Sequence, residues 1–120
     1  MTLRITGGPI NVEWESGSFG LWDGNRRIGH LHYVLFPSME GVIYLTDLVI
    51  EQEEERKKGY GRMLLEHFET VARDQGFREV ILFVVKQESL GFWRRMGYEG
   101  SYGVGKGFFK KLRTDATGTT

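Results

Sequence analysis

The sequence predicts an α+β domain with a mixed, mostly antiparallel sheet, a central βαβ unit and two main helices. Strand-like runs separated by turn residues fill the first part of the chain, 11–50, as in an antiparallel sheet. An amphipathic stretch, 61–75, then stands between two apolar runs, which is the order of a βαβ unit. The second of these runs, 80–85, is apolar throughout, as in a parallel strand buried on both faces.

Size and composition indicate one globular domain. The chain has 120 residues, of which 40% are hydrophobic and 27% are charged, and this fits a single core. We expect the domain to cover 1–113 and the small polar residues of 114–120 to form a disordered tail. No apolar run approaches the roughly 18 residues of a membrane span, and 1–5 lacks the apolar stretch of a signal peptide.

Charge and cysteine content exclude several kinds of function. Lys and Arg total 16, as do Asp and Glu, so the net charge is zero, whereas general nucleic-acid binders are usually basic. The absence of cysteine excludes disulfides, a thiol nucleophile and a Cys-ligated zinc site. We therefore expect a cytoplasmic protein that binds neither a membrane nor nucleic acid.

Alternation and turn chemistry predict the strands of the first part. Asp23-Gly24-Asn25 has the composition of a hairpin turn, and 37–41 forms another turn. The predicted strands are 11–15, 19–22, 27–36 and 41–50. Alternation along the third strand places Ile28, His30, His32 and Val34 on one face and Leu31, Tyr33 and Leu35 on the other.

The second part predicts two helices and two more strands. Apolar residues recur at helical spacing in 61–75, and Gly76 ends this helix. The apolar face consists of Leu64, Leu65, Phe68, Val71 and Ala72. A buried strand follows at 80–85, a shorter helix at 89–96 that Gly97 ends, and a final strand at 104–112. Phe108 and Phe109 should point to opposite faces of that strand.

The junction between the strand 41–50 and the first helix carries a phosphate-binding pattern. It reads Arg-Lys-Lys-Gly-Tyr-Gly from Arg56 to Gly61, and glycine lets the backbone approach a ligand closely. The first N–H groups of a helix have no helical partners and carry partial positive charge, which suits a phosphate. Full positive charges come from Arg56, Lys57, Lys58 and Arg62. The pattern predicts a pyrophosphate cradle, with a tight turn as the alternative.

Two motifs resemble the GNAT superfamily of N-acetyltransferases. The first, Arg/Gln-x-x-Gly-x-Gly/Ala in the family, is present at 56–61; the second, aromatic-x-x-x-Gly-aromatic, is present as Trp93-Arg94-Arg95-Met96-Gly97-Tyr98, preceded by Phe92. Their order, with a helix and a buried strand between them, matches the family over about residues 18–112. The resemblance implies acetyl-CoA as acetyl donor, without a metal, and direct attack on its thioester by an amine of a small molecule or a protein.

The resemblance also implies which residues bind acetyl-CoA. Backbone N–H groups of the glycine loop would hold the pyrophosphate, the end of the preceding strand would pair with the pantetheine arm, and the helix of the second motif would line the other side. The cofactor-binding residues predicted in this way are Leu48, Val49, Ile50, Arg56, Lys57, Lys58, Gly59, Tyr60, Gly61, Arg62, Phe92, Trp93 and Arg95.

The chain departs from the family pattern in ways that bear on catalysis. Trp93 stands where a tyrosine often acts as general acid, and an indole N–H is a donor without useful acidity. Lys86 stands where asparagine is frequent, and the loop after Ile50 is one residue longer. The region before residue 18 is too short for two helices that usually wall the acceptor pocket. The alternative function is therefore a non-catalytic acyl-CoA-binding or regulatory protein, and an open pocket allows a homodimer that completes it.

The catalytic candidates are a base and an acid. Deprotonating an alkylamine, whose pKa is roughly 10.4, calls for a base, and Asp47 at the end of the strand is the candidate, with a loop-anchoring carboxylate as its alternative role. Glu51 shares the face of Asp47 if the strand is regular. For the acid, Tyr102 is preferred to Tyr98, which suits packing.

Two further features have a structural and a functional interpretation. His30 and His32 share a face, which suits either a partly exposed β-face or, less well without a third ligand, a metal pair. The acidic run 51–55 suits a solvated loop, or a surface that attracts a cationic acceptor. A plain interaction module that binds no CoA is a third function class.

Overall fold

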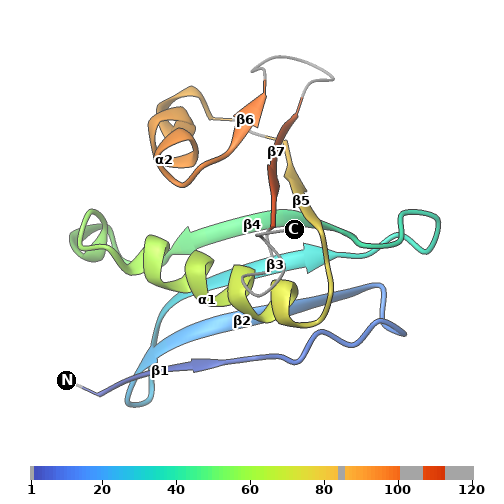
Figure 1. The fold of residues 1–120 in the computed structure, drawn as a ribbon. Helices are drawn as coiled ribbons and strands as arrows, with labels where there is room; N and C mark the ends of the chain where they lie inside the picture. The colour runs from blue at the N-terminus through green and yellow to red at the C-terminus, as the bar shows by residue number, and fades with distance from the viewer. Residues whose placement is uncertain (1, 84–85, 101–106, 113–120) are drawn as a thin grey trace.

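A computed structural model describes residues 2–83, 86–100 and 107–112. Its sheet has seven strands in the order β1-β2-β3-β4-β5-β7-β6, and α1 lies across one face of this sheet (Figure 1). The strands are β1 (Leu3–Thr6), β2 (Ser16–Asp23), β3 (Arg26–Val34), β4 (Val42–Ile50), β5 (Glu79–Leu82), β6 (Glu99–Gly100) and β7 (Phe108–Lys111). The helices are α1 (Tyr60–Asp74) and α2 (Leu90–Arg95), with single 3-10 turns at Glu53–Glu55 and Gln87–Ser89.

The predicted fold class is confirmed. Every neighbouring pair of strands is antiparallel except β4 and β5, which run parallel on either side of α1 in the chain and so form the βαβ unit. A parallel pair needs such a crossover because its two strands start at the same edge of the sheet.

The prediction of a strand at 11–15 is wrong. These residues form turns, in which the Asn11 side chain accepts a hydrogen bond from the Glu13 N–H (2.9 Å). Val12 and Trp14, whose alternation suggested the strand, remain 69% and 66% exposed. Asparagine competes for backbone donors in this way. The edge strand is instead β1, which pairs with β2 and was not predicted.

The prediction of which β3 residues share a face is wrong for Ile28, because the strand contains a bulge. His30 and His32 share a face as predicted, with ring centroids 5.0 Å apart. Ile28, predicted beside them, is completely buried in the core. The register between β2 and β3 shifts at Leu21 and Trp22, and an extra residue in one strand reverses the alternation there.

The core lies between α1 and the face of the sheet that α1 covers. Leu64, Leu65, Phe68 and Ala72 on α1 are fully buried, as their helical spacing predicts. Phe68 contacts Phe19 of β2 edge-on, with ring centroids 5.7 Å apart. Gly76 follows the helix with φ of 92°, in the left-handed region that glycine adopts most readily.

The last elements are shorter than predicted. β5 ends at Leu82, and 84–85 of the predicted strand lie outside the described residues. The final strand is β7, which pairs with β5 and β6; 104–106 of its predicted span and the predicted tail 114–120 also lie outside. Phe108 is fully buried and Phe109 partly buried.

Within the described part of the chain, neither helix is long and apolar enough to span a membrane.

Candidate active site

A cleft opens where β4 and β5 separate. The two strands pair only along Val42–Tyr44 of β4, although β4 continues to Ile50. The second half of β4 therefore has no strand on its β5 side in the described part of the chain. In Figure 1, β5 and β7 rise away from β4, and α2 lies above the end of β4 and the start of α1. Backbone groups along an unpaired strand edge are free to bind an extended ligand.

A second bulge lies in β4 beside this cleft. Leu45 pairs with Tyr33 and Asp47 pairs with His32, so Thr46 is the extra residue. The Thr46 hydroxyl donates to the His32 carbonyl oxygen (3.2 Å), which holds the bulge against β3. Bulges bend a strand and increase its twist, and this one lies just beyond the last residues of β4 that pair with β5.

A groove of about 1000 Å³ runs along the free edge of β4. Its walls are the end of β4, the loop after it, the first turns of α1, and α2 with the residues on either side. The lining residues are Leu48, Val49, Ile50, Arg56, Lys57, Gly59, Gly61, Arg62, Glu66, Lys86, Glu88, Ser89, Phe92, Trp93, Arg95, Met96, Gly97 and Lys110.

The start of α1 presents an uncapped helix end to this groove. Gly59 precedes the helix with φ of 88°, and a Cβ placed there would meet no atom within 4 Å. Among the described residues, no side chain caps this helix end, and its first turn holds no acidic residue. The first turn instead carries Arg62, whose charge is unfavourable near the positive end of a helix dipole. This arrangement suits an anion.

An ion pair with a buried carboxylate fixes the loop before Gly59. Glu55 is 6% exposed, and its two carboxylate oxygens each accept a hydrogen bond of 2.7 Å from the Arg26 guanidinium. This hydrogen-bonded pair, aided by the Lys58 charge, lowers the pKa of Glu55 below its ordinary value. The interpretation of 51–55 as a solvated loop is therefore wrong for Glu55, which anchors the loop to the β2–β3 hairpin.

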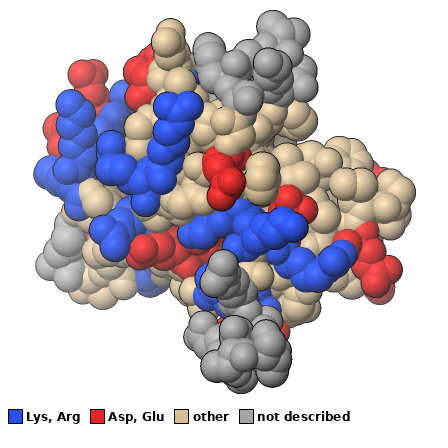
Figure 2. All heavy atoms as spheres, turned by 45° about the horizontal axis from the view of Figure 1, so that its top comes forward, with Lys and Arg blue, Asp and Glu red and all other residues tan. Residues whose placement is uncertain are grey.

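Basic residues outnumber acidic ones in the groove, although the whole chain is neutral. The cations in its lining are Arg56, Lys57, Arg62, Lys86, Arg95 and Lys110, and the carboxylates are Glu66 and Glu88. Figure 2 shows a concentration of Lys and Arg side chains on the side of the molecule where α2 and the start of α1 lie. Such a lining attracts anionic ligands.

The structure brings most of the predicted binding residues to one groove. Lys58 and Tyr60 are the exceptions, because neither lines it, and the Tyr60 side chain packs against the core. The predicted residues that line the groove are Leu48, Val49, Ile50, Arg56, Lys57, Gly59, Gly61, Arg62, Phe92, Trp93 and Arg95.

A smaller cavity of about 200 Å³ lies between β4 and β5. Asp47, the predicted base, lines this cavity together with Thr46 and Phe83. Both cavities are lined by Leu48, Val49, Lys86, Ser89 and Trp93, so they adjoin at the middle of β4. Tyr102, the predicted acid, lies outside the described residues.

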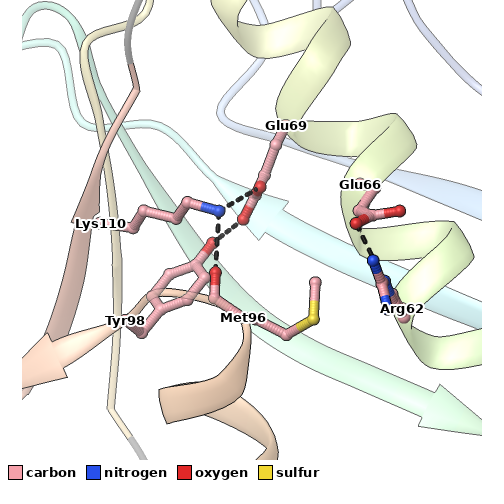
Figure 3. Close-up of polar contacts among 6 residues, drawn as sticks. All are labelled: Arg62, Glu66, Glu69, Met96, Tyr98 and Lys110. Atoms are coloured by element: carbon pink, nitrogen blue, oxygen red, sulfur yellow. Dashed lines mark hydrogen bonds and ion pairs between the residues drawn. The ribbon is translucent and has the colours of Figure 1, made fainter.

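Tyr98 has a structural environment. Its ring lies edge-on to Trp93 with centroids 5.3 Å apart, and its hydroxyl donates to the buried Glu69 carboxylate (2.7 Å). Burial, and then the Glu69 charge, raise the pKa of Tyr98 above its ordinary value. Lys110 donates to the same carboxylate (2.9 Å) and to the Met96 carbonyl oxygen (2.8 Å) (Figure 3). Tyr98 is thus part of a buried polar network that ties α1 to α2 and β7.

Several residues of the groove were not predicted. Glu66 pairs with Arg62 through an i,i+4 salt bridge of 3.1 Å (Figure 3), a spacing that the sequence does show. The Ser89 hydroxyl donates to the Lys86 carbonyl oxygen (2.7 Å) and holds the turn before α2. Lys110 comes from the far end of the chain, and no local pattern indicates its place.

The two histidines do not form a metal site with other described residues. Among residues 2–83, 86–100 and 107–112, no group of three or more metal-binding side chains is close enough to hold an ion. His30 is instead bound through Nδ1 to a Glu51 carboxylate oxygen (2.9 Å), which Arg27 also contacts. Glu51, like Glu55, is therefore paired and not free in a solvated loop.

Comparisons with known proteins identify this architecture. The model of the acetyltransferase (GNAT) family matches residues 6–98. The chain belongs to this family. This match confirms the family and the fold that the two motifs predicted. In a comparison of sequences, no curated protein matched the chain.

Solved structures of GNAT proteins share the fold at low sequence identity. PaiA N-acetyltransferase from Thermoplasma acidophilum, in complex with coenzyme A, is 22% identical with a TM-score of 0.71; the match covers 82% of this chain and 62% of that one. An acetyltransferase from Thermus thermophilus is 23% identical with a TM-score of 0.70, covering 84% and 67%. One from Bacillus cereus is 23% identical with a TM-score of 0.68, covering 82% and 74%. The GNAT chain thus spans less than two thirds of the Thermoplasma protein.

Proposed function

We propose that this GNAT protein transfers an acetyl group from acetyl-CoA to an amine. The groove carries the proposal, because it combines an uncapped helix start, a basic lining and the unpaired edge of β4. A pyrophosphate needs the first two features, and the amides of a pantetheine arm need the third. The coenzyme A complex of the similar Thermoplasma protein supports the same ligand class.

Each part of the groove has a role in this proposal. Backbone N–H groups from Lys57 to Arg62 hold the pyrophosphate, and the side chains of Arg56, Lys57 and Arg62 add charge. The free edge of β4 at Leu48–Ile50 binds the pantetheine arm. Phe92, Trp93 and Arg95 form the opposite wall. The acetyl group of the bound donor supplies the carbon that the amine attacks.

The smaller cavity is the proposed amine site. It adjoins the groove at Val49, and its lining holds one carboxylate, Asp47, and one ammonium group, Lys86, among mostly apolar neighbours. A carboxylate there attracts an alkylammonium and is the candidate base. For the acid, Tyr102 remains the candidate, since Trp93 has no acidic proton and Tyr98 is engaged by Glu69. The thiolate of CoA can also leave without an acid, because a thiol has a reference pKa of about 8.5.

Turnover measurements test the proposal. We would follow release of free CoA from acetyl-CoA with spermidine, tyramine, L-lysine and a lysine-containing peptide as acceptors. We expect CoA release that depends on at least one amine, with the acetylated product seen by mass spectrometry. Tight binding of acetyl-CoA without transfer to any acceptor would favour the alternative, a non-catalytic acyl-CoA-binding protein.

A further inference from the structure

A carboxylate and an imidazole form a hydrogen-bonded pair on the face of the sheet that α1 does not cover. Glu51, just after β4, accepts a hydrogen bond from Nδ1 of His30 on β3 (2.9 Å). The same Glu51 oxygen contacts Arg27, so this carboxylate is held by two partners. The two side chains are 21% and 26% exposed, so the pair is shielded but open to water on one side.

The pairing register places His30 beside the junction of the two cavities. His30 is directly opposite Val49 of β4, and the Cβ atoms of directly opposed residues lie about 4.5–5.5 Å apart on the same face. Val49 lines both the groove and the smaller cavity. Two residues along β3, His32 is opposite Asp47, which lines the smaller cavity. His30 itself lines neither cavity, so it lies behind the Val49 side chain, and a proton would reach it past that side chain or through one water molecule.

The charged neighbours of His30 come from its own strand, from β4 and from the residue after β4. On β3 these are Arg27 and His32, and on and after β4 they are Asp47 and Glu51. On β2, the residue opposite His30 is the uncharged Gly20. Glu51 fixes the proton of a neutral imidazole on Nδ1, because a carboxylate only accepts hydrogen bonds. Nε2 of His30 has no hydrogen-bond partner among the described residues, so its lone pair is available.

We propose that His30 accepts the proton of the amine at Nε2, directly or through one water, and that Glu51 is the positioning residue that orients its ring. The proposal rests on the acetyltransferase function proposed above. Imidazole has a reference pKa of about 6.5, much closer to neutral pH than the carboxylate value of about 3.9, and a base with such a pKa is better matched to this task. Asp47 then holds the ammonium group in place.

The reaction balances with these groups. One proton of the alkylammonium moves to Nε2 of His30, and the nitrogen lone pair that it leaves forms the new C–N bond to the acetyl carbon. The C–S bond breaks as this bond forms, and its electron pair goes to sulfur. A second proton from the nitrogen ends on the sulfur to give the free thiol of CoA. His30 returns its proton to water.

Nuclear magnetic resonance tests the geometry without an acceptor. Long-range ¹H–¹⁵N spectra of the histidine rings report which nitrogen carries the proton. We expect His30 to be protonated on Nδ1 when neutral, and saturating acetyl-CoA to shift its ring signals while those of His67, which packs against Phe19, stay unchanged. A His30 that is protonated on Nε2, or that does not respond to acetyl-CoA bound in calorimetry, would overturn the proposal. A protein that binds no acetyl-CoA at all would overturn the proposed function itself.

Kinetic measurements on variants test whether His30 accepts a proton or only connects two strands. Each variant is assayed with the amine that the wild type acetylates fastest. We expect His30→Gln to lower kcat by about 100-fold with the acetyl-CoA affinity unchanged, and this deficit to shrink as the pH approaches the pKa of the amine. The matched control, His32→Gln, removes the neighbouring ring and should change kcat by less than about threefold. Asp47→Asn should raise KM for the amine more than it lowers kcat.

The conservative variant Glu51→Gln tests the positioning role. Its amide oxygen can still accept from Nδ1, but it lacks the negative charge that favours the imidazolium. The acidic limb of the kcat profile should therefore move to lower pH. An unmoved limb, or a His30→Gln enzyme with kcat within about threefold of the wild type, would show that the pair only ties β3 to the end of β4.

Discussion

Gly59 is the residue whose backbone conformation the groove depends on most directly. Its φ of 88° lies in the left-handed region, while the space around its missing Cβ is empty. Any cost of a side chain there is therefore conformational and not steric. The turn that this residue makes directs the backbone from the loop into the first turn of α1, where the proposed anion site lies.

Gly59→Ala should destabilise the fold by about 1 kcal/mol, because a left-handed conformation costs an L-residue roughly 1–2 kcal/mol. Denaturant unfolding measures this change. Gly61→Ala is the matched control: its φ is not in the left-handed region, and its Cβ would lie 3.7 Å from Phe92, an ordinary contact. That variant should be neutral or stabilising, since alanine favours helix over glycine by about 1 kcal/mol. Equal destabilisation of the two variants would contradict the assigned loop conformation.

Tyr98→Phe separates a structural tyrosine from a catalytic one. The ring remains against Trp93, but the hydrogen bond to the buried Glu69 is lost, so we expect a loss of about 1–2 kcal/mol in unfolding free energy. Because burial and Glu69 raise the pKa of Tyr98, its hydroxyl is a poor acid, and kcat measured at a temperature where the variant is folded should not change. A kcat that falls by more than about tenfold would make Tyr98 the acid.

At the scale of elements, two ion-paired groups join segments that lie far apart in the chain. Arg26–Glu55 ties the hairpin of β2 and β3 to the loop before α1, and Glu69–Lys110 ties α1 to β7. In both, the carboxylate is buried and the cation is partly exposed. Neither pair follows from local sequence patterns, because the partners are separated by at least 29 residues.

Removing the centre of the buried network should loosen α2 and β7 from α1. Glu69→Leu removes the acceptor of the Tyr98 hydroxyl and leaves the Lys110 ammonium with the Met96 carbonyl oxygen but no carboxylate (Figure 3), and breaking a buried pair on one side costs about 3–5 kcal/mol. The double variant Glu69→Leu/Lys110→Met removes the orphaned charge, so its unfolding free energy should recover part of this loss. A double variant that is less stable than the single one would contradict this account of the network.

Acid should weaken the loop before α1 through Glu51 and Glu55. The hydrogen bond from His30 to Glu51, and that from Arg26 to Glu55, lower the pKa of each carboxylate below its ordinary value of 4.5. When folding lowers the pKa of a carboxylate, the carboxylate stabilises the fold fully at any pH above its pKa in the unfolded chain. This stabilisation is lost as the pH falls through its pKa in the folded protein. Tm should therefore decline as the pH falls below about 4.5.

The acidic run itself provides the control for this prediction. Glu51→Gln/Glu55→Gln should lower Tm at neutral pH and make the decline of Tm in acid shallower. Glu53→Gln/Glu54→Gln changes two exposed members of the same run and should leave both the Tm and its pH dependence nearly as in the wild type. The account of the loop is wrong if the two double variants behave alike.

At the scale of the whole molecule, the sequence predicted what periodicity and local chemistry determine. The helix face with Leu64 and Phe68, the βαβ order and the glycine loop were all predicted. The bulges at Ile28 and Thr46 were not, because a bulge is decided by the pairing of two strands. The burial of Glu55 and the arrival of Lys110 in the groove were missed for the same reason: each depends on a partner distant in the chain.

Charge is also distributed on the scale of the whole molecule. The chain has no net charge, yet most of the charged side chains that line the groove are cations, and Lys and Arg gather on that side of the molecule (Figure 2). Binding of a polyanion such as acetyl-CoA should therefore weaken as salt increases from about 0.05 to about 0.5 M, because the Debye length shortens. An affinity that does not change with salt would contradict an electrostatic role for the lining.

The central claim, that the loop from Arg56 to Arg62 holds the pyrophosphate of acetyl-CoA, is tested most directly by titration calorimetry. The wild type, Gly61→Glu and a surface control, Glu53→Gln, would be titrated with acetyl-CoA, desulfo-CoA and ATP. We expect micromolar binding of both CoA forms, weaker binding of ATP, no change in the control, and at least about a hundredfold loss in Gly61→Glu, where a carboxylate faces the phosphates. Equal affinity of Gly61→Glu and the wild type for acetyl-CoA would contradict the claim.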